Sequence, residues 1–567
     1  MADSVVSFLL ENLTQSLSQE SKLLGGVEDQ VRLLQNELCL INVFLKNTEG
    51  KRHDNDLVKQ VVSQIRDVAY EAEDVIDTFI ITVTKHRKRS KLRKVIHYFD
   101  RASALHEVAN KIERIKNVIK EIYENRRKYG IEIAESSGGD AEAEEILHRR
   151  RRYVEEDHVV GFGQDTQTLV KQLIEGSSQL NVVSIIGMGG LESDEEKFLE
   201  IRSDVNLSPM SKCRRISIHC ANHPYISSKH CEPSNNRSVI GFGGVVGLES
   251  PLDKGYYLKW LCKSNKLVRV VELRNTGLRF LIPKKIENLV LLRYLSISSG
   301  TLDVIPDSIC NLWNLEMLDM RNSKIKCLPT GIWKLQKLSH LYLDGPTSLP
   351  RADDEATLPN LQVITGIVIN HDTESLFAKA KFPNQRKLGL CLLNVAQSGL
   401  FTLSLSSIHP LRHLQTLKIC RSINLTNPSS LQLTLTKITL QDVQVVSPSI
   451  RVLGCLNKLR ILKVNRCNSF EIDCDESSFC QLQVLKMAKL TVLQWTMMKG
   501  AMPRLQRLVI ERCNFFKMPP DELWCLSALR DVEVLHPDQD LANMLRHLQM
   551  RDGCELQVYP PLNSSLP

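Results

Sequence analysis

The 567-residue sequence contains no uncharged apolar run of about 20 residues, so it predicts no permanent transmembrane helix. Its N-terminus, MADSVVSFLLENL, has no basic leader and no small-residue cleavage site, and is therefore not expected to be a secretion signal. Sixteen cysteines occur without a CxxC pair, which argues against a zinc site or a disulfide framework and favours reduced thiols in a cytosolic protein. The net charge of +8 is modest for this length and implies no nucleic-acid partner.

The first 130 residues carry apolar residues at alternating steps of four and three, which is the spacing of a buried stripe on a helix. The first stripe consists of Val27, Val31, Leu34, Leu38, Ile41 and Leu45. The second consists of Val61, Ile65, Val68, Ala72, Val75 and Phe79, and the third of Val108, Ile112, Ile115, Ile119 and Ile122. These stripes are short, so with a further helix at 2–20 they favour a four-helix bundle over an extended coiled coil, which needs longer unbroken heptads.

Two basic runs and one acidic segment interrupt this pattern. The run KHRKRSKLRK occupies 85–94, and four arginines occupy 149–152. Runs of one charge sign are usually solvated loops, although an acidic membrane surface could also attract them. The acidic, glycine-containing part of residues 131–155 predicts a flexible linker.

Three consecutive stretches of the C-terminal half repeat one ladder of apolar residues at a spacing of 23 residues. The ladder positions are Leu289, Leu292, Leu295 and Ile297; Leu312, Leu315, Leu318 and Met320; and Leu335, Leu338, Leu341 and Leu343. Such a fixed period is typical of leucine-rich repeats, each of which is too small to bury its own apolar face. Less regular copies extend the pattern over 212–560 to roughly ten to thirteen repeats. The fold class is therefore an α domain followed by an α/β repeat solenoid.

Two kinds of residue mark fixed positions within the predicted repeats. Pro306 and Pro329 each precede an isoleucine by three residues, on the side of the repeat where the chain returns. Cys467 and Cys513 each follow the end of a predicted strand by three residues, where such repeats turn an asparagine or cysteine inward. We therefore expect both cysteines to be structural.

A glycine-rich segment upstream of the repeats begins like a phosphate-binding loop. Its glycines are Gly187, Gly189 and Gly190. A working loop continues with a glycine, a lysine that neutralises the phosphates and a hydroxyl that binds magnesium. Glu192, Ser193 and Asp194 occupy those positions instead, and the two acids would repel a triphosphate. The sequence therefore predicts no nucleotide hydrolysis, no catalytic residues, no bound cofactor and no metal site.

These features together resemble one family, the plant intracellular disease-resistance receptors, which have a coiled-coil head, a central nucleotide-binding switch and a leucine-rich tail. The run EDVID at 73–77 is similar to the acidic signature of the third helix in such heads. VGF at 160–162 and VVSIIGMGGL at 182–191 resemble the start of the nucleotide-binding domain, which binds ADP or ATP in the family. RRISI at 214–218 resembles the start of the repeats. The resemblance implies a head at 1–130, a remnant of the switch at 156–211 and repeats at 212–560.

In this family the acidic helix docks against arginines at the start of the repeats, in the position after the second ladder residue. The implied head-to-repeat contact consists of Glu73, Asp74, Asp77, Arg269 and Arg293. The next equivalent position holds Glu316, which departs from the pattern. From the residues alone, Glu73 and Asp77 are four apart and share a polar helix face, which could equally be solvated.

The first residues, MADSVVSFLLENLTQSL, are similar to the N-terminal helix with which activated members of the family act on membranes. The resemblance implies that Phe8, Leu9, Glu11 and Leu13 belong to this signalling helix, and that acidic residues near Glu11 line a cation-conducting funnel in an oligomer. From the residues alone, Glu11 could equally be an ordinary solvated acid.

Three functions are compatible with these features. The first is an innate-immunity receptor, in the cytoplasm or at the periphery of the plasma membrane, that recognises a pathogen effector or a guarded host protein. The second is a shortened regulator or decoy that pairs with full-length relatives. The third is a switch that hydrolyses ATP slowly, against which Ser193 and Asp194 argue because a lysine and a hydroxyl are required there.

Overall fold

The computed structural model describes residues 6–7, 9–11, 13–14, 28–48, 56–87, 98–128, 199–202, 214–218, 235–242, 256–274, 281–391, 402–404, 408–420, 424–426, 434–442 and 447–561. The predicted linker at 131–155 and the loop glycines Gly187, Gly189 and Gly190 lie outside these residues. The chain divides into two compact units. The first comprises 1–241, 260–270 and 289–291, and the second comprises 242–259, 271–288 and 292–567.

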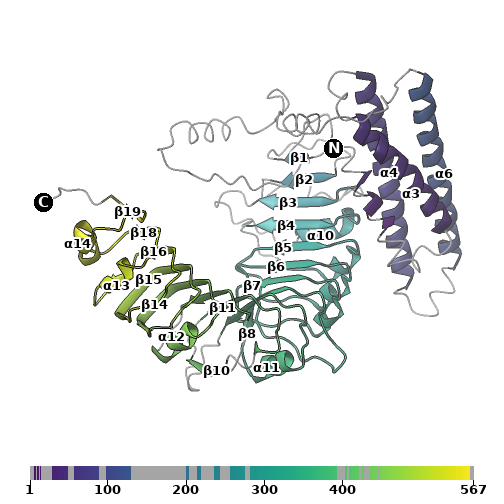
Figure 1. The fold of residues 1–567 in the computed structure, drawn as a ribbon. Helices are drawn as coiled ribbons and strands as arrows, with labels where there is room; N and C mark the ends of the chain where they lie inside the picture. Colours follow the sequence, from purple (N-terminus) through teal and green to yellow (C-terminus); the bar gives the residue numbers. More distant parts are fainter. Residues whose placement is uncertain are drawn as a thin grey trace. The chain divides into compact units, whose positions relative to one another are not determined.

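The first unit contains the helical head. Its long helices are α3 (Glu28–Thr48), α4 (Asp56–Arg87) and α6 (Tyr98–Lys128), and the described residues between 6 and 14 are also helical. Figure 1 shows α3, α4 and α6 as neighbouring rods. All described residues of the three predicted stripes are buried, which confirms the four-helix bundle. Because α4 continues to Arg87, the first three residues of the basic run at 85–94 are helical and do not belong to a loop.

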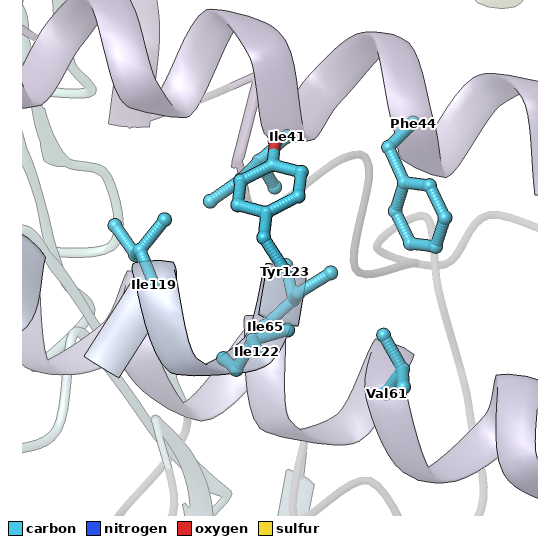
Figure 2. Close-up of a pocket in the computed structure, with 7 residues that line it drawn as sticks. All are labelled: Ile41, Phe44, Val61, Ile65, Ile119, Ile122 and Tyr123. Atoms are coloured by element: carbon cyan, nitrogen blue, oxygen red, sulfur yellow. The ribbon is translucent and has the colours of Figure 1, made fainter. Parts of the chain in front are cut away.

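The stripes meet in an apolar interior between α3, α4 and α6. Figure 2 shows seven side chains from these helices around a small apolar pocket. They are Ile41, Phe44, Val61, Ile65, Ile119, Ile122 and Tyr123. Each such side chain contributes roughly 1.5–3 kcal/mol when it is fully removed from water, so the three-helix contact accounts for much of the stability of the head.

The first unit also contains the first strands of the repeat region. Strands β1 (Leu199–Arg202), β2 (Arg215–Ile218) and β3 (Ser238–Phe242) pair in parallel, and Ile216 lies level with Val239 in the β2–β3 pair. The compact unit that holds the helices therefore also contains the start of the predicted repeat region.

The second unit is built on a parallel sheet whose strands come from successive repeats (Figure 1). The strands are β4 (Val270–Arg274), β5 (Tyr294–Ile297), β6 (Met317–Met320), β7 (His340–Leu343), β8 (Val363–Val368), β9 (Lys387–Cys391), β10 (Thr402–Ser404), β11 (Thr416–Cys420), β12 (Asn424–Thr426), β13 (Lys437–Gln441), β14 (Ile461–Cys474), β15 (Val484–Met497), β16 (Arg507–Glu511), β17 (Asn514–Phe515), β18 (Asp531–Leu535) and β19 (Glu555–Tyr559). Strands β10 and β12 form a separate small sheet.

Short helices occupy the returning side of the repeats. The α-helices are α10 (Tyr256–Ser264), α11 (His371–Ala378), α12 (Ser447–Gly454), α13 (Asp521–Trp524) and α14 (Gln539–His547), and the 3-10 helices are η4 (Lys284–Asn288), η5 (Asp307–Asn311) and η6 (Thr330–Lys334). Pro306 and Pro329 precede η5 and η6 directly, at the returning positions that the sequence predicted.

The leucine ladder forms the core of the repeats. All twelve ladder residues of the three regular repeats are buried, and Leu295 lies level with Leu318, which in turn lies level with Leu341. Cys467 and Cys513 are buried as well, so their predicted interior position is confirmed. Burial of several leucines per repeat, at roughly 1.5–3 kcal/mol each, therefore holds every repeat to its neighbours.

Strands β8, β9, β13 and β19 belong to repeats for which the sequence analysis identified no ladder. In the repeat of β9, the buried Gln385 stands where a ladder leucine would be expected. Its side-chain amide donates hydrogen bonds to the carbonyl oxygens of Gln362 at 3.0 Å and Lys387 at 2.5 Å. A polar residue can take a core position when backbone carbonyl groups accept its amide hydrogens, which is why a search for leucines overlooks such repeats.

Candidate functional site: the acidic–arginine cluster

Helix α4 carries two acidic residues on a buried face. Its apolar residues Val75 and Phe79 pack into the bundle, whereas Glu73 and Asp77, four residues apart, lie together on a different face. That face is not solvated, because only 7% of Glu73 and 4% of Asp77 is exposed. Burial of ionised carboxylates is costly unless opposite charges compensate them, so partners are required.

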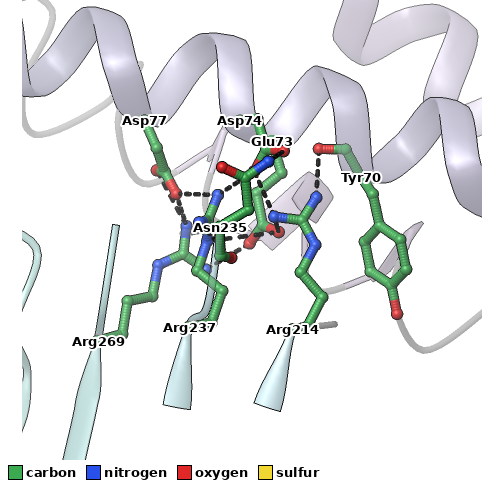
Figure 3. Close-up of polar contacts among 8 residues, drawn as sticks. All are labelled: Tyr70, Glu73, Asp74, Asp77, Arg214, Asn235, Arg237 and Arg269. Carbon is green, nitrogen blue, oxygen red and sulfur yellow. Dashed lines mark hydrogen bonds and ion pairs between the residues drawn. The ribbon is translucent and has the colours of Figure 1, made fainter. Parts of the chain in front are cut away.

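The partners are three arginines, each directly before a strand. Arg214 precedes β2, Arg237 precedes β3 and Arg269 precedes β4. The amide of Arg237 donates to the carbonyl oxygen of Arg214 at 2.6 Å, and the amide of Arg269 donates to that of Arg237 at 2.8 Å. Because neighbouring strands lie about 4.8 Å apart, the three guanidinium groups form a short column alongside α4 (Figure 3). We call these arginines with Glu73, Asp74 and Asp77 the acidic–arginine cluster.

Arg269 joins the two most buried carboxylates. Its Nη1 donates to Oε1 of Glu73 at 2.5 Å, and its Nη2 donates to Oδ2 and Oδ1 of Asp77 at 2.8 Å and 3.0 Å. The planar guanidinium can serve both acceptors at once, a geometry that lysine cannot reproduce. Arg269 is itself only 7% exposed, so these charge-assisted bonds are almost fully shielded from water.

Asp74 is held by the other two arginines. Arg237 Nη2 lies 2.6 Å from Oδ1 of Asp74 and 2.9 Å from Oδ2 of Asp77. Arg214 also donates to Oδ1 of Asp74, and its Nη2 donates to the backbone oxygen of Tyr70 at 2.5 Å. Asn235 completes the group, because its amide donates to Oδ2 of Asp74 at 2.9 Å.

Arg214 makes a further contact with the ring of Tyr70, over which its guanidinium carbon lies 4.4 Å from the centroid. A guanidinium above an aromatic face is attracted to the ring quadrupole by roughly 0.5–2 kcal/mol. Helix α4 therefore contributes one aromatic ring and one carbonyl oxygen to the site, in addition to its three acids (Figure 3).

The charges of the cluster balance, with three guanidinium groups against three carboxylates. Burial by itself raises the pKa of Glu73, but the charges of Arg269, Arg237 and Arg214 outweigh it and hold this pKa below its ordinary value. Burial raises the pKa of Asp74, against the lowering effect of Arg214 and Arg237. The pKa of Arg269 is raised by the charges of Asp77 and Glu73 despite its burial, so this arginine remains protonated.

The structure brings together part of the set that the family resemblance implied. It places Glu73 and Asp77 against Arg269, and Asp74 against two arginines that were not predicted. Arg293, the other predicted arginine, forms an ion pair with Glu316 in the next repeat, at 3.7 Å between Nη1 and Oε1. Its contact with the head stays a prediction.

A signal for the two missing arginines was present in the sequence. Ile216 and Val239 are 23 residues apart and match the third ladder position. Arg214 and Arg237 stand two residues before them, as Arg293 stands two residues before Leu295. Extending the ladder register to these two irregular repeats identifies both arginines, although only the packed structure shows which arginines reach α4.

The other predicted site residues lie apart from the cluster. Leu9 and Leu13 are buried in the head, and Glu11 is exposed between them, whereas Phe8 lies outside the described residues. The glycines of the phosphate loop lie outside them as well. Within the described ranges, no group of three histidine, cysteine or acidic side chains has an arrangement that could hold a metal ion. None of the described helices is long and apolar enough to span a membrane.

Comparisons with known proteins bear on both parts of the chain. Residues 5–102 match the Rx N-terminal domain, and residues 258–430 match a leucine-rich repeat region. A protein of Arabidopsis thaliana named as a disease resistance protein is 33% identical over 196 residues, which are 34% of this chain and 23% of that relative. The chain is therefore similar to plant disease resistance proteins, with an Rx N-terminal domain and a leucine-rich repeat region.

A second similar protein is the disease resistance protein RPP13 of Arabidopsis thaliana, 26% identical over 196 residues, which cover 34% of this chain and 24% of RPP13. The chain therefore spans about a quarter of the length of these curated relatives. Among solved structures, a leucine-rich repeat protein of Leptospira interrogans is 18% identical, with a TM-score of 0.32 and coverage of 56% of this chain and 90% of that protein. A likeness of that degree carries no information about function.

Proposed function

We propose that this chain is an innate-immunity receptor in which the acidic–arginine cluster holds the helical head against the first repeats in the resting state. The repeats form the surface that recognises a pathogen effector or a guarded host protein inside the cell. The head is the module that signals or docks onto other receptors of the family. This function requires neither catalysis nor a bound nucleotide.

The observation that carries the proposal is the burial of five charged side chains at the cluster, with Asp74 as the sixth member at its rim. A buried ion network adds little net stability over an apolar contact, but it is very sensitive to the loss of one partner, which costs roughly 3–5 kcal/mol. Such a contact is specific, and a competing interaction that removes one partner can open it. Those are the properties needed in a reversible contact between a sensor and a signalling module.

Expression of the full chain in leaves tests this role of the acidic–arginine cluster. Arg237→Glu/Arg269→Glu places two acids against the acidic face of α4, so we expect cell death that the parent chain does not cause at equal abundance. Arg293→Glu is the matched control, because it changes an equivalent repeat position whose ion pair is with Glu316. Equal responses to the parent, the double variant and the control would contradict the proposal.

The N-terminal helix provides the test of signalling. Glu11 is exposed and can be changed without disturbing the packing of the head, whereas Leu9 and Leu13 are buried. In the released Arg237→Glu/Arg269→Glu background, Glu11→Ala should abolish cell death if its carboxylate acts in an assembled oligomer. Leu9→Glu would place a charge in the bundle core, so its loss of activity would report unfolding of the head. This variant therefore serves only as an inactive control.

A regulator that pairs with full-length relatives is the second candidate, and the defective phosphate loop favours it. Glu192, Ser193 and Asp194 replace the residues that bind phosphate and magnesium, so the chain would depend on a partner for any nucleotide-driven step. Absence of cell death from every variant, together with suppression of a co-expressed full-length receptor, would support the regulator. Stoichiometric ADP or ATP released on denaturation of the purified protein would refute the loss of nucleotide binding.

A further inference from the structure

A group of lysines lies on the solvent-facing side of the central sheet, within the second unit. They are Lys387 on β9, Lys418 on β11, Lys437 on β13 and Lys463 on β14. Their strand neighbours Leu388, Leu417, Ile438 and Leu462 are buried in the core. Because side chains alternate between the two faces of a strand, the four lysines point away from that core. All four are half-buried, and we call them the lysine patch.

The strand register sets the layout of the lysine patch. Lys387 lies level with Thr416, which lies level with Lys437. Lys418 lies level with Thr439, which lies level with Lys463. The lysines therefore form two staggered rows that cover four adjacent strands, a width of about 14 Å at the usual strand spacing. Threonines, and no acids, fill the positions between them.

The lysine patch has no acidic partner among the described residues, whereas the cations beside it do. Lys486 on β15 pairs with Glu511 at 3.2 Å, and Arg507 on β16 pairs with Glu533 at 2.9 Å. Beyond the patch in the other direction, Arg321 pairs with Asp319 through Nη2 at 2.6 Å. These neighbouring cations on the same face are neutralised by carboxylates, whereas, in the part of the chain that the structure describes, the four patch lysines are not.

Burial and the nearby positive charges lower the pKa values of two patch lysines. Burial and then the charges of Lys437, Arg321 and Lys418 lower the pKa of Lys387. Burial and then the charges of Lys437, Lys486 and Arg507 lower the pKa of Lys463. The ammonium groups of Lys387 and Lys463 are therefore less favourable in the free protein than they would be in water, and a bound anionic group would relieve that cost.

We propose that the lysine patch binds a short acidic segment of a protein partner. A width of about 14 Å exceeds what one small anion can contact and suits several carboxylates spaced along a polypeptide. The ion pairs of Glu511 and Glu533 bound the patch on one side, so the unneutralised positive charge spans only a few residues' length and does not continue as an extended nucleic-acid backbone would require. Tyr342 on β7 borders the patch near Lys387, whose Nζ lies 5.8 Å from the ring centroid, and provides an apolar edge for the peptide. The choice of a protein partner rests on the proposed receptor function.

Fluorescence anisotropy with the purified full chain tests this inference. The probe is a fluorescein-labelled peptide of alternating glutamate and serine, and its counterpart has glutamine for every glutamate. We expect the acidic peptide to bind, the glutamine peptide not to bind, and added KCl to weaken binding. Lys418→Gln/Lys463→Gln should weaken it at least tenfold. Lys499→Gln/Lys517→Gln removes the same charge from two exposed lysines outside the patch and should change it less than twofold.

Several results would overturn the inference. These are no binding of the acidic peptide, equal losses in the two double variants, or tighter binding of a single-stranded oligothymidylate or of phosphatidylserine vesicles. The melting temperature checks folding, because removing like-charge repulsion should leave Lys418→Gln/Lys463→Gln at least as stable as the parent. Since this readout needs no signalling, the peptide can bind even if the leaf experiments fail, so failure of the two proposals can be told apart.

Discussion

Replacement of Arg269 by alanine is the most direct test of how the head is held. Arg269 is buried and donates to Glu73 at 2.5 Å and to Asp77 at 2.8 Å and 3.0 Å. Arg269→Ala removes all of these bonds and leaves two buried carboxylates short of positive charge. We expect a loss of roughly 3–5 kcal/mol in the contact, the usual cost of stranding one member of a buried ion pair.

That loss is measurable if the head and the repeats are separated covalently. A protease recognition site in place of residues 136–139 allows the purified, folded chain to be cut, and a C-terminal tag then retains the repeats. The fraction of head that stays bound reports the contact. A loss of 3–5 kcal/mol corresponds to about two to four decades in the dissociation constant. The parent head should therefore stay bound under conditions where the Arg269→Ala head is washed away.

The double variant Arg269→Ala/Asp77→Ala measures the coupling between Arg269 and Asp77. It removes a stranded carboxylate together with its arginine, so it should cost less than the sum of the two single changes, by roughly 0.5–3 kcal/mol. Arg293→Ala is the matched control, because its pair with Glu316 is partly exposed and worth only about 0–1 kcal/mol. Equal release of the head by Arg269→Ala and Arg293→Ala would refute the assignment of the contact to the cluster.

Three further predictions follow from single sites. The pKa of Glu73 is lowered in the folded chain, so the contribution of its carboxylate to the contact between head and repeats is present above the ordinary carboxyl value of 4.5 and is lost as the pH falls through the lowered value. The difference in head retention between the parent and Glu73→Gln should therefore be constant from pH 8 to 5 and shrink below pH 4.5. Ile119→Ala at the apolar pocket should lower the free energy of unfolding of the head by roughly 2–5 kcal/mol in urea titrations, whereas Lys120→Ala on the exposed face should change it little. Lys381 is 2% exposed, and its ammonium group donates to the carbonyl oxygens of Asp353 and Asp354. Lys381→Met should therefore destabilise the repeats by roughly 1–3 kcal/mol in thermal melts. A variant as stable as the parent would contradict this.

The fold was largely readable from the sequence because it depends on periodicity. Apolar residues at steps of three and four must share one helix face, and a leucine ladder with a fixed period must stack. Every described residue of the three stripes is buried, and so is every residue of the regular ladder. Repeats in which a polar residue such as Gln385 replaces a leucine were missed, since its burial depends on backbone carbonyls supplied by neighbouring strands.

The sequence by itself determined that α4 carries an acidic face and that arginines recur at one position of the repeats. Which arginines meet which acids was decided only by the tertiary structure. Both Arg269 and Arg293 hold the same place in their repeats, yet Arg269 binds Glu73 and Asp77 while Arg293 binds Glu316. The physical reason is that ion pairing depends on distance across the packed structure, and residues far apart in the chain, such as Asp74 and Arg237, become neighbours only when helix and sheet have folded together.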